Sequence, residues 1–99
     1  MKKAIFNQYA YEVSKLFSLD QKEIFNKGKR RDIVGSRHML FYLCYKRGMY
    51  GTEIKKYMND SGYNINHSSI MYGVKCANDL IQNDKDYASL IRKVSLCVD

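Results

Sequence analysis

The chain has 99 residues, with 17 Lys and Arg against 10 Asp and Glu, which gives a formal net charge of +7 at pH 7. This length predicts a single domain, covering 1–99, with a modest hydrophobic core. Three cysteines are too few for a disulfide framework, and the longest apolar run, at 39–45, is far shorter than the roughly 18 residues that a membrane helix requires. We therefore expect no membrane partner, three buried thiols and a cytoplasmic location, since the basic N-terminus becomes polar too soon for a signal peptide.

The positive charge is concentrated in the first half of the chain. Residues 1–50 hold 11 of the 17 Lys and Arg but only 4 of the 10 acidic residues, so residues 51–99 are neutral in sum. Such a distribution favours a polyanionic partner, either nucleic acid or an anionic membrane surface. A purely solubilising role is the alternative.

Two helices are predicted before residue 30. Apolar residues at intervals near 3.6 predict a helix over 2–17. A short helix is expected within 20–28, where Asp20 and Glu23 fit a capping box and Gly28 fits the position just past the helix end. Both helices are expected to contribute to the core.

A cluster of cations precedes the third helix. It consists of Lys27, Lys29, Arg30 and Arg31. Apolar spacing predicts a helix over 33–46, for which Asp32 is placed as the N-cap. Arg37 and His38 interrupt the apolar face of that helix near the cluster, so we expect both side chains to be available to a ligand.

Three more helices are predicted in the second half. A short amphipathic helix covers 49–58, and turn-forming residues occupy 59–66. A longer helix begins at Asn66, and a closing helix carries apolar residues from Tyr87 to Val98. With no strand pattern, the predicted fold class is all-α with about six helices. Ile70, Val74, Ala77 and Ile81 lie on the apolar face of the longer helix. Ser68, Ser69, Met71 and Lys75 lie off that face.

The cation cluster and the polar start of the longer helix suit double-stranded DNA. Lys and Arg neutralise phosphates or enter a minor groove, whereas Asn, His and Ser at a helix N-terminus can bind phosphate or base edges. A basic lead-in followed by helix, short helix, turn and helix is typical of a helix-turn-helix DNA-binding protein. Each feature also has an ordinary structural explanation: a solvated charged surface, an N-cap at Asn66 or Ser68, or a core position for His67.

Three segments, KRRDIVGSRHMLFYL, GTEIKKYM and NHSSIMYGV, resemble the C-terminal DNA-binding domain (domain IV) of the bacterial replication initiator DnaA, a helix-turn-helix relative of the Trp repressor. The resemblance covers about 11–94. It implies a central helix-turn-helix and a stand-alone reader of duplex DNA that acts in replication initiation or its regulation, with a replication protein or its own copies as further partners. The alternatives are a transcription regulator of the Trp-repressor type, or a protein-interaction or structural module that kept the fold.

The resemblance also implies roles for particular residues. Lys29, Arg30 and Arg31 match a basic turn whose Arg enters the minor groove, and Arg37 matches the Arg of an Arg-Gln pair. A His-Thr-Thr motif that reads the major groove is matched by His67, Ser68 and Ser69, with Met71 at an apolar contact position. The DNA-contacting residues expected on this basis are Lys29, Arg30, Arg31, Arg37, His38, Asn66, His67, Ser68, Ser69, Met71 and Lys75.

The chain departs from the family pattern at several positions. Asn66 stands where the family has an acidic residue, His38 where it has Gln, and Tyr45 where it often has Lys; the turn before Asn66 is also longer. These changes affect the expected base preference and remove one phosphate cation. No G-x-x-x-x-G-K-[ST] motif is present, so we expect no bound nucleotide and no origin unwinding by this chain alone.

Catalytic and metal sites are not expected. The Cys and His residues have no C-x-x-C or H-x-x-x-H spacing, and no acid is placed to orient a Cys-His pair. The nine Tyr residues are spread through predicted helices, with Tyr9, Tyr57 and Tyr87 at core spacing, which favours packing over base stacking on single strands. The chain is therefore predicted to be a binding protein without cofactor or metal rather than an enzyme.

Overall fold

The apolar spacing in the sequence produces six helices. The structure is a computed structural model that describes residues 2–98, and within those residues it has no strand. The predicted all-α class with about six helices is confirmed. The helices are α1 (Lys2–Leu16), α2 (Gln21–Ile24), α3 (Arg31–Lys46), α4 (Gly51–Asp60), α5 (His67–Asn83) and α6 (Lys85–Cys97).

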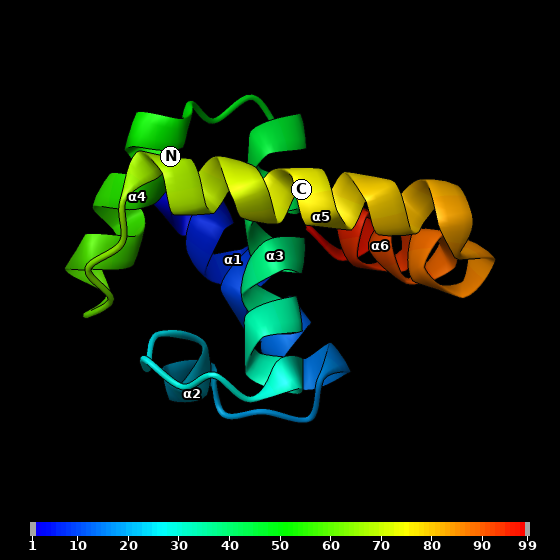
Figure 1. Ribbon diagram of the computed structural model, residues 1–99, viewed down its shortest axis with the longest axis horizontal. Helices are drawn as coiled ribbons and strands as arrows, with labels where there is room; N and C mark the ends of the chain where they lie inside the picture. The colour runs from blue at the N-terminus through cyan, green and yellow to red at the C-terminus, as the bar shows by residue number, and fades with distance from the viewer. Residues whose placement is uncertain (1, 99) are drawn as a thin grey trace.

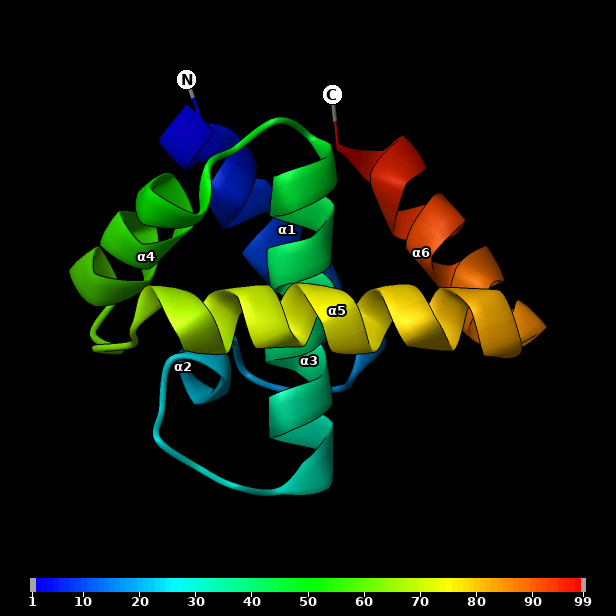
Figure 2. The ribbon, with the colours of Figure 1, turned by 45° about the horizontal axis from the view of Figure 1, so that its top comes forward.

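Helix α3 is the centre of the fold and contacts all the other helices. Figure 1 shows α5 crossing in front of α3, with α1 behind, and Figure 2 shows α4 and α6 on opposite sides of α3. The molecule measures 32 × 30 × 25 Å along its principal axes. A helix surrounded in this way must be apolar on most of its sides. The buried residues of α3 are accordingly apolar except for Ser36 and Arg37; the apolar ones are Ile33, Met39, Leu40, Phe41, Leu43 and Cys44.

The crossing of α3 and α5 is the most extensive helix–helix contact in the described chain, and it depends on a glycine. A Cβ at Gly73 of α5 would lie 2.8 Å from Cδ2 of Phe41 and 2.9 Å from Cδ2 of His38 on α3. Real Cβ atoms do not come this close, so only glycine lets α5 lie directly on α3. This contact fixes where the first turn of α5 emerges at the surface.

The predicted core faces are confirmed. Phe6, Tyr9 and Val13 of α1 are buried, as are Ile70 and Val74 of α5, and each fully buried large apolar side chain contributes about 1.5–3 kcal/mol of transfer free energy. Tyr57 and Tyr87, also predicted at core spacing, are partly buried and pack against this core.

Three local expectations are wrong. Only Cys44 is a buried thiol: Cys76 is half-buried and Cys97 is exposed, because Cys97 lies off the apolar face of α6. Helix α2 has neither expected end: Asp20 is its N-cap but makes no side-chain cap hydrogen bond, and the helix ends at Ile24, so Gly28 is not the residue just past its end. Helix α3 begins at Arg31, which places Asp32 inside its first turn instead of at the N-cap.

Candidate nucleic-acid interface

The segment between α2 and α3 carries exposed cations. We call residues 27–31 the cationic elbow; its four basic side chains are all solvent-exposed. Arg30 forms an ion pair with Asp32, with Nε 3.0 Å from Oδ1 and Nη2 3.1 Å from Oδ2. The hydrogen bond from Arg30 lowers the pKa of the Asp32 carboxyl below its ordinary value, so the pair is fully ionised and locally neutral at pH 7. Within residues 2–98, the positive charge of the elbow that no ion pair compensates belongs to Lys27, Lys29 and Arg31.

Two basic residues outside the cationic elbow, both in α1, form ion pairs with acidic residues. Lys2 Nζ lies 3.0 Å from Oε2 of Glu53, and Lys3 Nζ lies 3.4 Å from Oδ2 of Asp60, so two cations of α1 pair with acids of α4. These pairs are exposed and contribute little to stability. Lys2 and Lys3 are therefore not part of the uncompensated positive charge.

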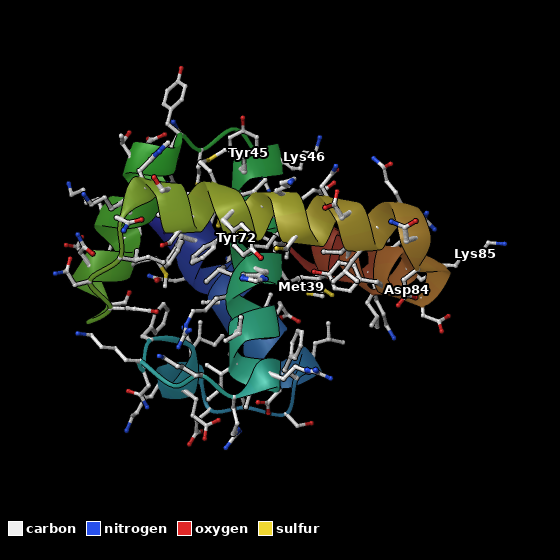
Figure 3. The ribbon with its side chains drawn as sticks, in the orientation of Figure 1. Met39, Tyr45, Lys46, Tyr72, Asp84 and Lys85 are labelled. Atoms are coloured by element: carbon white, nitrogen blue, oxygen red, sulfur yellow. The ribbon has the colours of Figure 1, made fainter. Side chains whose placement is uncertain are left out.

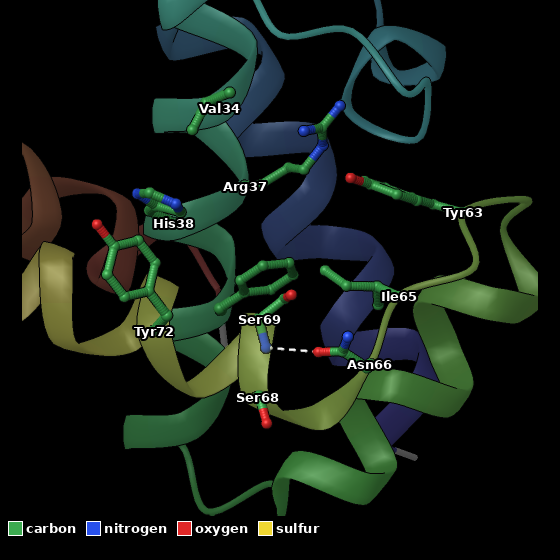
Figure 4. Close-up of a pocket in the computed structure, with 10 residues that line it drawn as sticks. Val34, Arg37, His38, Tyr63, Ile65, Asn66, Ser68, Ser69 and Tyr72 are labelled. Atoms are coloured by element: carbon green, nitrogen blue, oxygen red, sulfur yellow. Dashed lines mark hydrogen bonds between the residues drawn. The ribbon is translucent and has the colours of Figure 1, made fainter.

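Arg37 is not available to a ligand as the sequence predicted. Its side chain is only 5% exposed and has no acidic partner among the described residues. Nε donates to the carbonyl oxygen of Ile24 at 2.8 Å, and Nη2 donates to the carbonyls of Asn26 and Gly28. Figure 4 shows the guanidinium directed from α3 toward the segment that follows α2. Arg37 therefore holds the backbone from which the cationic elbow continues.

A tyrosine from another part of the chain completes this contact. The Tyr63 ring, in the connection between α4 and α5, has its centroid 4.4 Å from Cζ of Arg37. Burial lowers the pKa of the Arg37 guanidinium from its ordinary value, and Tyr63 opposes that shift. A guanidinium remains charged under such conditions. One cation therefore joins the α2–α3 segment to the α4–α5 connection.

His38, on α3, is half-buried where α3 packs against α5. Its ring meets the Tyr72 ring edge-on, with centroids 6.0 Å apart and planes at 85°. Burial lowers the pKa of the His38 imidazole, and the charge of Arg37 lowers it further. His38 is therefore neutral at pH 7 and adds no cation to this surface.

The first turn of α5 is the exposed polar element that the sequence predicted. Asn66 is the N-cap, and its Oδ1 accepts a hydrogen bond from the Ser69 backbone N–H at 2.8 Å. Asn66, His67, Ser68 and Ser69 are all exposed, so His67 is not a core histidine. We call these four residues the α5 head. Its cap is an ordinary structural feature, but the side chains of His67 and Ser68 remain accessible at the surface.

The α5 head lies between two hollows. On one side, Asn66, Ser68 and Ser69 line a cleft of about 380 Å³ whose opposite wall includes Arg37 and Tyr63. On the other side, His67 and Met71 line a hollow of about 390 Å³ with Tyr45, Tyr50, Gly51 and Thr52. A Cβ at Gly51 would overlap Nε2 of His67, so the imidazole lies against the start of α4. The predicted motif residues thus divide between two sides of one helix end.

Two tyrosines for which the sequence predicted no contact role are exposed on opposite sides of α5: Tyr45 at the end of α3 and Tyr72 on α5 itself. Tyr72 is 64% exposed and Tyr45 is 43% exposed. Figure 3 shows Tyr45 and Lys46 on one side of α5 and Tyr72 on the other. Farther along α5, Lys75 is exposed, as predicted. Tyr72 could have been found from the helical spacing, since it lies one turn after Ser68 and Ser69.

Other site types find no support in the described chain. Residues 2–98 contain no group of three His, Cys, Asp or Glu side chains that could hold a metal ion. No helix among them is long and apolar enough to cross a membrane. Comparison with known proteins gives no family: no family model matches the chain. No solved structure matches it at a significant level either.

Proposed function

We propose that this chain binds double-stranded DNA through a helix-turn-helix formed by α4 and α5. The α5 head enters the major groove, where His67 and Ser68 contact base edges, and the cationic elbow contacts phosphates or an adjacent minor groove. One observation carries the proposal: an exposed, capped helix end shares a cleft with the guanidinium that holds the exposed cationic segment. Polar groups for bases beside cations for the backbone are what duplex recognition requires.

The biological role follows from the sequence resemblance alone. A reader of this kind, similar to the origin-binding domain of DnaA, acts in replication initiation or its regulation. The departure at Asn66 gives it a base preference of its own. Because His38 is neutral and half-buried, we assign it to the packing of α3 against α5 instead of to base contact.

The first experiment identifies the site. Duplexes bound from a random pool are sequenced, and affinity for the selected duplex is compared with that for a scrambled duplex of equal composition. We expect a sequence preference, and both affinities should fall steeply between about 50 and 200 mM salt. Equal affinity for the two duplexes would contradict sequence reading, and the absence of salt-dependent binding would contradict DNA binding and favour a protein-interaction module.

Two sets of variants then test the two halves of the interface. Replacing Lys27, Lys29 and Arg31 with Gln should weaken binding to all duplexes and reduce the salt slope by about 0.9 for each phosphate that is no longer neutralised. The matched control removes three exposed cations from α6 through Lys85→Gln, Arg92→Gln and Lys93→Gln, and should change the slope less.

His67→Ala and Ser68→Ala test base reading. Each should cost about 1–3 kcal/mol on the selected duplex and little on the scrambled one. Both residues are exposed, so the variants are expected to fold as the parent does. Unchanged discrimination in both would show that the α5 head does not read bases.

A further inference from the structure

A groove on another side of the cationic elbow has the properties of a ligand site. It lies between the end of α1, the first half of α3 and the region where α5 is followed by α6, and has a volume of about 890 Å³. This lies within the range of roughly 300–1,000 Å³ typical of small-molecule pockets. Its apolar walls are formed by Leu16, Phe17, Met39, Leu80, Tyr87 and Leu90.

The groove is left open by a glycine that steric packing does not require. Gly35 lies inside α3, and a Cβ there would be 3.5 Å from Cε2 of Phe17, an ordinary van der Waals distance. Glycine in a helix interior is less favourable than alanine, so its presence calls for a reason other than close packing. The rim also exposes apolar surface, since Leu80 is 44% and Leu90 is 37% exposed. Unfilled apolar surface in a concave site is typical of ligand binding.

The rim of the groove carries a positive charge with no acidic partner in the described part of the chain. Arg30, Arg31 and Asp32 all border the groove, but Arg30 and Asp32 neutralise each other in a two-point ion pair. Arg31 has no acidic group within 4.0 Å among residues 2–98. A guanidinium binds carboxylates and phosphates through two parallel hydrogen bonds. An apolar groove with such an arginine at its rim is complementary to a molecule with an apolar body and one anionic group.

We propose that this groove binds a small amphipathic acid, whose apolar body lies against Phe17, Met39 and Leu80 and whose anionic group pairs with Arg31. This inference stands apart from DNA binding, because the groove and Arg31 are present without DNA. If the proposed function also holds, the acid and a DNA phosphate compete for Arg31, so the ligand would weaken DNA binding.

The test uses two acids and a neutral analogue in the absence of DNA. 1-Naphthaleneacetate and decanoate are titrated into ¹⁵N-labelled protein, and 1-naphthaleneacetamide serves as the matched neutral probe. We expect saturable amide shifts near Gly35, Leu80 and Leu90 with at least one acid, and at least tenfold weaker binding of the neutral amide. The stronger acid shows whether the body is aromatic or aliphatic. No binding up to about 1 mM, or shifts located elsewhere, overturns the proposal.

Variants test the two parts of the site separately. Arg31→Gln should weaken binding of the acid at least tenfold without affecting the amide, and Gly35→Met should abolish binding of both by filling the groove. Lys29→Gln is the control, because it removes a cation from the same elbow at a residue that does not border the groove. In the absence of DNA it should bind the acid and the amide as the parent does. Circular dichroism checks the fold of each variant. Equal binding by Arg31→Gln and parent, or full binding by a folded Gly35→Met, would overturn the assignment.

Discussion

Replacing Arg37 with Leu should destabilise the protein and loosen the cationic elbow. The substitution keeps an apolar stem but leaves the carbonyls of Ile24, Asn26 and Gly28 without their donor. A hydrogen bond from a charged group contributes about 1.5–3 kcal/mol, and the Tyr63 contact adds about 0.5–2 kcal/mol. The sum is reduced because the Asn26 and Gly28 carbonyls are only partly buried and regain water, and because Leu avoids the cost of burying a charge. We expect a loss of about 2–4 kcal/mol, a large part of the stability of a small domain.

Urea unfolding followed by circular dichroism measures this loss, and limited trypsin digestion measures the local effect. Cleavage after the basic residues of 27–31 should be faster in Arg37→Leu than in the parent, because the backbone there is no longer anchored. Arg92→Leu, at an exposed position of α6, is the matched control and should change neither measurement. A free energy of unfolding within about 0.5 kcal/mol of the parent, with unchanged cleavage at 27–31, would refute the anchoring role of Arg37.

Three further predictions concern α5 and its packing. Gly73→Ala should lower the free energy of unfolding by about 1–3 kcal/mol in urea titrations, because its Cβ would overlap Phe41 and His38. An unchanged urea midpoint would show that α3 and α5 can move apart enough to accept a Cβ at this position without loss of stability. Asn66→Ala should cost about 1 kcal/mol through loss of the cap bond to Ser69, and Asn66→Asp should restore it; equal stability of Ala and Asp variants would contradict the cap. The folded-state pKa of His38 is lowered, so the unfolded chain binds a proton more readily than the folded protein, and the free energy of unfolding should fall as the pH drops below about 6.5. His38→Gln should flatten the dependence of the free energy of unfolding on pH between about pH 7 and 5.5. An identical pH dependence in both proteins would contradict the burial of His38.

The helices could be predicted because their causes are local. The apolar intervals that place Ile70 and Val74 on one face need only neighbours on the same helix, and the cap at Asn66 needs a backbone group three residues away. The role of Arg37 could not be predicted, because its partners are carbonyls 9 to 13 residues distant that become accessible only once α2 packs beside α3. The groove beside Arg31 is likewise formed by several helices together, so no segment of the sequence indicates it.

The cap at the start of α5 has a consequence for the bases that this helix end would read under the proposed function. Asparagine recognises adenine by accepting from N6 and donating to N7 at once, which occupies both its amide oxygen and its amide nitrogen. The oxygen of Asn66 is already engaged by the Ser69 N–H. The amide oxygen has a second lone pair, so in the proposed complex Asn66 can still accept from adenine N6, and the cap hydrogen bond fixes the direction from which that base must approach.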